Sequence, residues 1–316
     1  MNTTTSGATG LRHVGFIDLP EHTGQGGFDH ADVHKGNRVL YVAHTANDAL
    51  DLIDLDTARY LRSISGLKGV AGALVSESDD RVFTSNRGED TVSMFSARSG
   101  EKPSKIVVGT RPNGLAYDPT RGLLLCANVG DPAVPAPPSL TMVDVTDWSV
   151  IATVPVSGRT RWAVHDPETG NFFVNIADPP EILVVDARRP ESVSSRIAIP
   201  ARGPHGLDLD PKDRRLYCAC DEGVLVSIDP DSGTVQGALE LSGAPDVIFL
   251  NHNRTRLYVA IGDPGIIDVI DVAHWRKAES VTTEPGAHTL AFDGKAERVY
   301  AFLPQSHRAS VYHDPT

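Results

Sequence analysis

A short sequence pattern that recurs along this chain of 316 residues constrains its fold more than any other feature. Three clear copies occupy residues 111–119, 203–211 and 285–293. Each copy is followed by a turn and by a run rich in β-forming residues, and a further apolar run then ends in an aspartate. Self-similarity of this kind is typical of repeat architectures, in which every repeat forms one supersecondary unit.

Alignment on this pattern divides the chain into seven units. Each unit supplies one reference residue at the start of its first expected strand, and successive reference residues lie 41 to 48 residues apart. The longest gap contains a proline-rich insertion at 131–139, which predicts a loop. The reference residues are His30, Ala71, Asn113, Arg161, His205, Asp246 and His288.

Every unit predicts four short strands, and no segment of helical length has a 3.6-residue apolar period. In the first unit we expect strands near 29–34, 38–43, 50–55 and 60–65. Four-stranded units that repeat at roughly 40–50 residues are typical of propeller blades. The sequence therefore predicts an all-β fold: a seven-bladed β-propeller of four-stranded antiparallel blades, in one domain over residues 1–316.

The ends of the chain predict how the ring closes. The last unit has only three expected strands, and a strand within 11–20 can supply the fourth, which pairs an otherwise open edge. The blades are expected at about 27–67, 69–109, 111–158, 159–201, 203–242, 244–284 and 286–316.

Composition excludes several classes of function. The net charge is −12 and no basic run is present, which argues against a nucleic-acid partner. No window is long and apolar enough to predict a membrane span, and the polar N-terminus does not resemble a signal peptide. Cys126, Cys218 and Cys220 do not suggest a disulfide framework, so we expect buried free thiols. We therefore expect a cytoplasmic protein; its oligomeric state stays open.

The repeats resemble those of the YVTN-type β-propeller family and its lactonase-like and surface-layer relatives. The similarity lies in Tyr-Val-Ala at 41–43, Leu-Tyr-Cys-Ala at 216–219 and Leu-Tyr-Val-Ala at 257–260. It extends to Leu-Ile-Asp-Leu-Asp-Thr at 52–57 and Val-Ser-Ile-Asp-Pro-Asp-Ser-Gly at 226–233. The resemblance implies a propeller fold and, through the lactonase-like members, hydrolysis of a lactone or similar ester. This chain departs from the pattern at the reference position, where three units carry histidine.

Four reference residues predict a metal site. His205, Asp246, His288 and His30 belong to four consecutive blades once the ring closes, and all should face the mouth of the central channel. Three imidazoles and a carboxylate suit a divalent transition metal (Zn, Mn, Fe, Ni or Cu), with an open position for water or substrate. The alternative for this mouth is an anion-binding site, in which the histidines and Arg161 grip a carboxylate or phosphate.

Further polar residues are expected on the same face. We expect His44 to act as an acid or base beside His30, and Arg161, standing opposite the metal, to hold an anionic substrate group. His34, His165, His252, His274 and His313 should lie at the opposite ends of the strands. The expected substrate-binding residues are Asn113, Asn175, Arg87, Trp162, Glu21, His22 and His307.

The leading hypothesis is a metal-dependent enzyme that acts on a small anionic or oxygen-rich molecule, with lactonase-like hydrolysis as the expected reaction. The same site suits a metal-dependent lyase, isomerase or non-haem oxygenase. The alternative from another class is a non-catalytic propeller that binds a ligand or a protein on its faces.

Overall fold

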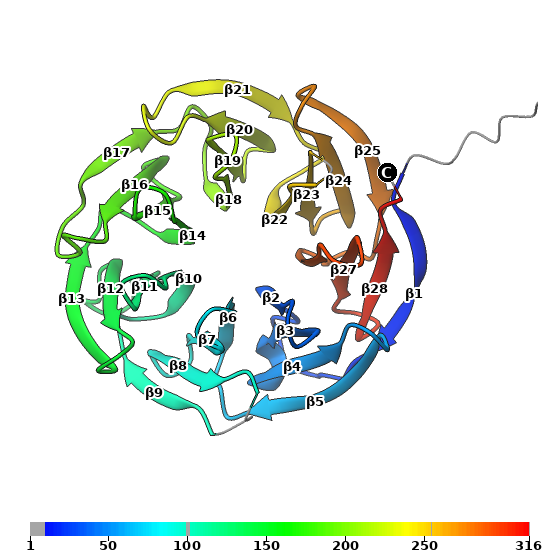
Figure 1. The fold of residues 1–316 in the computed structure, drawn as a ribbon, viewed down its shortest axis with the longest axis horizontal. Helices are drawn as coiled ribbons and strands as arrows, with labels where there is room; N and C mark the ends of the chain where they lie inside the picture. Colours follow the sequence, from blue (N-terminus) through cyan, green and yellow to red (C-terminus); the bar gives the residue numbers. More distant parts are fainter. Residues whose placement is uncertain (1–9, 99–101, 254, 316) are drawn as a thin grey trace, which may run out of the picture.

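Seven four-stranded antiparallel sheets stand around a central axis in the computed structural model, which describes residues 10–98, 102–253 and 255–315 (Figure 1). The predicted seven-bladed propeller is therefore confirmed. In six blades the four strands follow one another in chain order from the axis outward. Helical structure in the described residues is limited to the 3-10 turn η1 (Thr45–Asn47).

The strand boundaries repeat closely from blade to blade. The first three complete blades are β2 (Ala31–His34), β3 (Val39–His44), β4 (Ala49–Asp54) and β5 (Arg59–Ser65); β6 (Val70–Ser76), β7 (Arg81–Asn86), β8 (Thr91–Ser96) and β9 (Ser104–Val107); and β10 (Pro112–Asp118), β11 (Leu123–Asn128), β12 (Ser139–Asp144) and β13 (Ser149–Pro155). The next three are β14 (Thr160–Asp166), β15 (Asn171–Ile176), β16 (Glu181–Asp186) and β17 (Ser195–Ala198); β18 (Pro204–Asp210), β19 (Arg215–Cys220), β20 (Val224–Ile228) and β21 (Val235–Glu240); and β22 (Pro245–Asn251), β23 (Arg256–Ile261), β24 (Ile266–Asp271) and β25 (Arg276–Thr282).

The last blade combines the first and the last strands of the described chain, as the sequence predicted. It consists of β26 (Thr289–Asp293), β27 (Arg298–Leu303), β28 (Arg308–His313) and, outermost, β1 (Arg12–Asp18). β1 pairs antiparallel with β28, and the amide of Leu19 donates to the carbonyl of His307 at 2.9 Å. The closing strand thus removes an open sheet edge.

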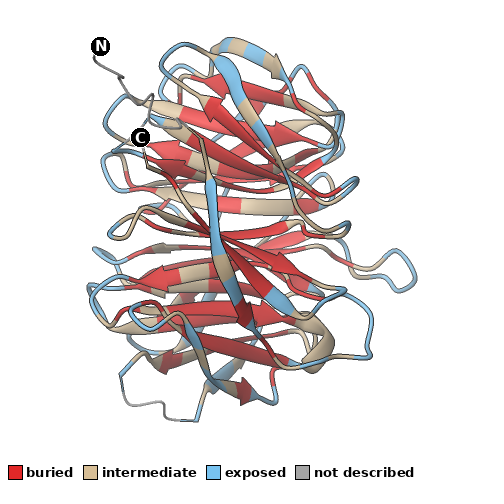
Figure 2. Ribbon diagram, turned by 90° about the vertical axis from the view of Figure 1, so that its right-hand side faces the viewer, coloured by how far each residue is buried: buried red, intermediate tan, exposed pale blue. Residues whose placement is uncertain are grey.

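The core lies between the blades rather than at the axis. The second strand of each blade is buried almost throughout, because each sheet packs against a neighbour on both of its faces. The outermost strands, by contrast, include many exposed residues (Figure 2). Apolar residues from adjacent blades form mixed clusters, such as Phe173 with Leu216 and Tyr217 with Leu257. Cys126, Cys218 and Cys220 are buried free thiols.

A glycine after the reference residue lets neighbouring blades approach closely. A Cβ on Gly206 would lie 2.2 Å from the carbonyl oxygen of Asp246, and a Cβ on Gly114 would lie 2.3 Å from that of Arg161. Only a residue without a side chain fits at these two positions. These close contacts hold His205 and Asn113 against the next blade.

Candidate functional site

The seven reference residues form a ring around one mouth of the channel, because each lies within the first two residues of an innermost strand or immediately before it. Backbone hydrogen bonds join neighbouring blades at two places on this ring. The amide of His30 donates to the carbonyl of Ala71 at 3.0 Å, and the amide of Val247 donates to that of His288 at 3.4 Å. The repeated backbone thus sets the positions of the reference residues, and their side chains set the chemistry of the mouth.

Asp246 is the acidic reference residue, and its neighbours in the ring include histidines. Its Oδ1 lies 3.2 Å from Nε2 of His205. Burial of Asp246 acts to raise its pKa, but the charges of His205, His288 and His30 outweigh burial and hold that pKa well below its usual range. Of the four residues that the sequence grouped as metal ligands, the structure thus puts His205 in contact with Asp246, whereas His288 and His30 act on Asp246 through their charge.

His205 makes a second set of contacts. Its Nδ1 lies 2.7 Å from Oδ1 of Asp221, and its Nε2 lies 3.1 Å from Nη1 of Arg161. Burial acts to lower the pKa of His205, but Asp246 and Asp221 together raise it to about 9. The expectation that Arg161 stands opposite this group is wrong: its guanidinium lies against His205, because their blades are neighbours. With its pKa raised, His205 is protonated at neutral pH, so its Nε2 donates to Asp246, and the adjacent guanidinium of Arg161 acts on it as a second positive charge.

The two remaining histidines have different surroundings. The imidazole of His30 is almost fully buried and stacks on Trp162 with ring centroids 4.1 Å apart. Its Nε2 lies 3.3 Å from Oδ1 of Asp29, and burial lowers its pKa. His288 places Nδ1 2.8 Å from the carbonyl of Gly286. Within residues 10–98, 102–253 and 255–315, no three His, Cys, Asp or Glu side chains stand in an arrangement that could hold a metal ion. The metal stays a prediction.

A polar chain links the first blades across the mouth. Arg87 Nη1 lies 3.1 Å from Oδ2 of Asp29, and Arg87 Nη2 donates to Oδ1 of Asn113 at 2.5 Å. Asn113 is buried, so it contributes to the mouth mainly by positioning Arg87. Asn175 is also buried and donates to the carbonyls of His205 and Gly206, which ties two blades together rather than facing a ligand.

A line of hydrogen-bonded side chains runs from the interior of the first blade to the same face. His44 Nδ1 lies 2.7 Å from Oδ2 of Asp51, and both side chains are fully buried. His44 Nε2 lies 2.8 Å from Nδ1 of His22, which in turn lies 3.2 Å from Nδ1 of His307. Ser63 donates to the other oxygen of Asp51 at 2.5 Å.

This line can store or move a proton. Burial, followed by the nearby His44 and His307, lowers the pKa of His22, which favours the neutral form of this half-buried imidazole. Sequence reasoning found the three histidines but missed Asp51. The available signal was its position, since this aspartate interrupts the apolar run of β4. Glu21 is exposed, and its carbonyl accepts a hydrogen bond from Asn47 at 3.2 Å.

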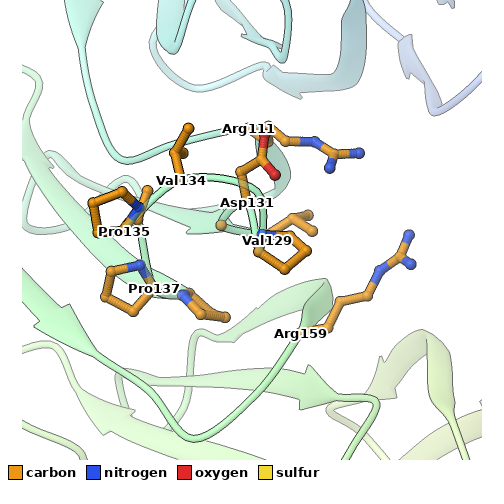
Figure 3. Close-up of a pocket in the computed structure, with 11 residues that line it drawn as sticks. Arg111, Val129, Asp131, Val134, Pro135, Pro137 and Arg159 are labelled. Atoms are coloured by element: carbon orange, nitrogen blue, oxygen red, sulfur yellow. The ribbon is translucent and has the colours of Figure 1, made fainter.

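A cavity of about 620 Å³ lies beside the mouth, beneath the proline-rich insertion (Figure 3). Its walls are mostly apolar and include Val129, Val134 and Pro137, whereas Arg111 and Arg159 extend their guanidinium groups on one side of it. Neither guanidinium has a hydrogen bond or ion pair within the described part of the chain. Burial, then the charges of Arg161, Arg87 and Arg111, lowers the pKa of Arg159. Arg159 is therefore close enough to the other three arginines for their charges to act on it.

The channel below the mouth is a second cavity, of about 460 Å³. Inner-strand side chains such as Leu115, Leu207 and Ile248 line it, and His30 and Trp162 lie at the strand starts, toward the mouth. His165 and His252, from the far ends of their strands, also line it. The stacked His30–Trp162 pair therefore lies between the polar mouth and this largely apolar channel.

Comparison with known proteins supports the fold alone. No protein family matches the chain, and no curated protein matches it either. A solved structure, "Crystal Structure of Mitotic Checkpoint Complex", contains a chain with a TM-score of 0.81 to this one. That match covers 99% of this chain and 95% of the other, with 10% sequence identity. The seven-bladed propeller is thereby supported, whereas the YVTN-type family stays a prediction. None of the helices formed by the described residues is long and apolar enough to cross a membrane.

Proposed function

We propose that this propeller is a binding protein that recognises an organic anion at the mouth formed by the reference residues. The observation that carries this proposal is the grouping of Arg87, Arg111, Arg159 and Arg161 at one sector of the mouth, in a chain whose net charge is −12. Arg111 and Arg159 lack a partner among the described side chains, so their charges are free for a ligand. Guanidinium groups bind carboxylates and phosphates through paired, charge-assisted hydrogen bonds.

Two sources of this anion have the same chemistry: a free small molecule, or acidic side chains of a partner protein. The similar chain comes from a structure titled "Crystal Structure of Mitotic Checkpoint Complex", and this title supports a partner protein as one source. Propellers in general support many unrelated functions, so the site rather than the fold carries the argument.

The test is calorimetric titration with citrate, inorganic phosphate and an oligoglutamate peptide at low and at high salt. We expect binding that weakens with salt, since attraction between exposed charges is screened. The double variant Arg111→Gln/Arg159→Gln should lose at least about tenfold in affinity. Arg202→Gln, on the same face but paired with Glu222, is the matched control and should bind like the wild type. Absence of binding to all three probes would refute the proposal.

A metal-dependent enzyme is the second candidate, and the surroundings of Asp246 favour it. The carboxylate of Asp246 contacts His205, and the charges of His288 and His30 act on it; one carboxylate and three imidazoles are donor types that suit Zn, Mn, Fe, Ni or Cu. Metal binding would require His205 to leave its contact with Arg161. His44, oriented by Asp51, would then act through His22 as the acid or base, and the reaction would be lactonase-like hydrolysis or a lyase, isomerase or oxygenase reaction.

Metal analysis of protein purified without chelators tests this second candidate. We expect about one metal ion per chain in the wild type and none in Asp246→Asn. His274→Ala is the control, because His274 is exposed and pairs with Asp271 away from the mouth. If the wild-type protein is purified without metal and gains no stability from added Zn, Mn, Fe, Ni or Cu, the metal-dependent enzyme is excluded. We also infer that the chain is a divergent YVTN-type propeller and is cytoplasmic; its repeat motifs support the first inference and its free thiols the second.

A further inference from the structure

The loop formed by residues 131–138 makes one wall of the cavity and is held by its own backbone hydrogen bonds. The amide of Asp131 donates to the carbonyl of Ala136 at 2.9 Å, and the amide of Ala136 donates to the carbonyl of Val134 at 2.7 Å. At its base, the amide of Gly130 donates to the carbonyl of Thr110 at 3.0 Å. Four prolines in this short segment further restrict the backbone. These hydrogen bonds and prolines restrict the conformations that the loop can adopt.

The inside of this wall is apolar, yet it is open to water. Val134 is 49% exposed although it lines the cavity, and prolines and Val129 continue the apolar surface. A cavity of about 620 Å³ is of the size that holds small organic ligands. Burying such a surface beneath a ligand is favourable in proportion to the apolar area covered.

The cationic groups lie on one side of the cavity. The guanidinium groups of Arg111 and Arg159 both extend there (Figure 3). Asp131 also lines the cavity, but its Oδ1 accepts the amide of Ala133 at 2.9 Å, so the carboxylate serves the turn of its own loop. The site thus combines an apolar wall with two cationic groups that have no protein partner among the described residues.

We propose that this cavity binds a small carboxylate with an apolar body, which lies against the 131–138 loop while Arg111 and Arg159 hold the carboxylate. This inference rests on the proposed anion-binding function and names its ligand class. Acetate or phosphate alone would leave the apolar wall wet, and a neutral apolar molecule would leave the two guanidinium charges unpaired. A molecule that has both parts satisfies the whole site.

The experiment is isothermal titration calorimetry with 1-naphthoate, acetate and 1-naphthalenemethanol. We expect 1-naphthoate to bind at least about tenfold more tightly than either of the other two probes, because each of them lacks one part of the recognition. Arg159→Gln and Val134→Asp should each weaken 1-naphthoate binding about tenfold. Arg202→Gln again serves as the control, and the melting temperature of each variant verifies that it folds.

The outcomes separate this inference from the proposed function. If citrate, phosphate or oligoglutamate binds through Arg111 and Arg159 while 1-naphthoate binds no better than acetate, the mouth recognises anions but the inference is overturned. The same holds if Val134→Asp binds 1-naphthoate as the wild type does. If no anion binds at all, both the inference and the proposed function fail.

Discussion

The ion pair between Arg38 and Asp293 joins the first and last blades, so its removal tests ring closure directly. Arg38 precedes β3, and Asp293 ends β26. Nη1 and Nη2 of Arg38 donate to the two carboxylate oxygens at 2.8 and 2.5 Å, and the Asp293 side chain is fully buried. Arg38→Gln would leave that carboxylate with the amide of Lys295, at 3.0 Å, as a remaining partner. Breaking a buried pair on one side typically costs about 3–5 kcal/mol, and we expect a loss of that size in unfolding free energy.

The loss of unfolding free energy in Arg38→Gln should depend on pH, in a direction set by the pKa of Asp293. In the wild type, burial acts to raise the pKa of Asp293, but Arg38 outweighs it and the pKa lies below its usual value. The pair therefore stabilises the fold above the unfolded-state pKa of about 4, and this contribution falls as pH drops through the lower folded-state value. In Arg38→Gln, burial still raises the pKa of Asp293, and the guanidinium that lowers it is gone. The deficit of the variant should be greatest near neutral pH and should shrink toward acid.

Urea unfolding followed by circular dichroism, at neutral and at acid pH, measures both effects. Arg308→Gln is the control, since Arg308 pairs with Asp18 on the surface at 2.8 Å, and its loss should cost less than about 1 kcal/mol. The double variant Arg38→Gln/Asp293→Asn should recover part of the stability, because no buried charge is left. If Arg38→Gln unfolds within about 1 kcal/mol of the wild type at every pH, the assigned role of this ion pair is wrong.

Three further predictions concern the ring. Deleting residues 1–19 removes β1 with buried Ile17 and Leu19, so the melting temperature of the chain should fall sharply. An unchanged melting temperature would contradict ring closure by this strand. Gly206→Ala forces a Cβ to within 2.2 Å of a backbone oxygen and should destabilise the fold by several kcal/mol, about 2–4, in thermal unfolding. Burial raises the pKa of Asp208 to about 6. The unfolding free energy of the wild type relative to Asp208→Asn should therefore fall by up to about 3 kcal/mol as pH rises from 4 to 7. Parallel curves of unfolding free energy against pH for the two proteins would refute this.

The sequence by itself determined the architecture. The recurring segment, the regular spacing of reference residues and the missing strand of the last unit predicted seven blades and closure by the N-terminus, and the structure confirms these features. This was possible because a repeat fold uses one local pattern many times, and each copy carries the same strand and turn signals. The same alignment placed His205, Asp246, His288 and His30 in neighbouring blades.

Only the tertiary structure decided what those side chains contact. The direction of a side chain depends on its rotamer and on partners far away in sequence, and repeat spacing contains no information about either. Thus Arg161 lies against His205 rather than opposite it, and Asn175 holds two blades together. Asp51 completes the His44 line from inside a buried strand. The cavity beneath the 131–138 loop arises where an insertion meets arginines of two other segments, so no single stretch of sequence could show it.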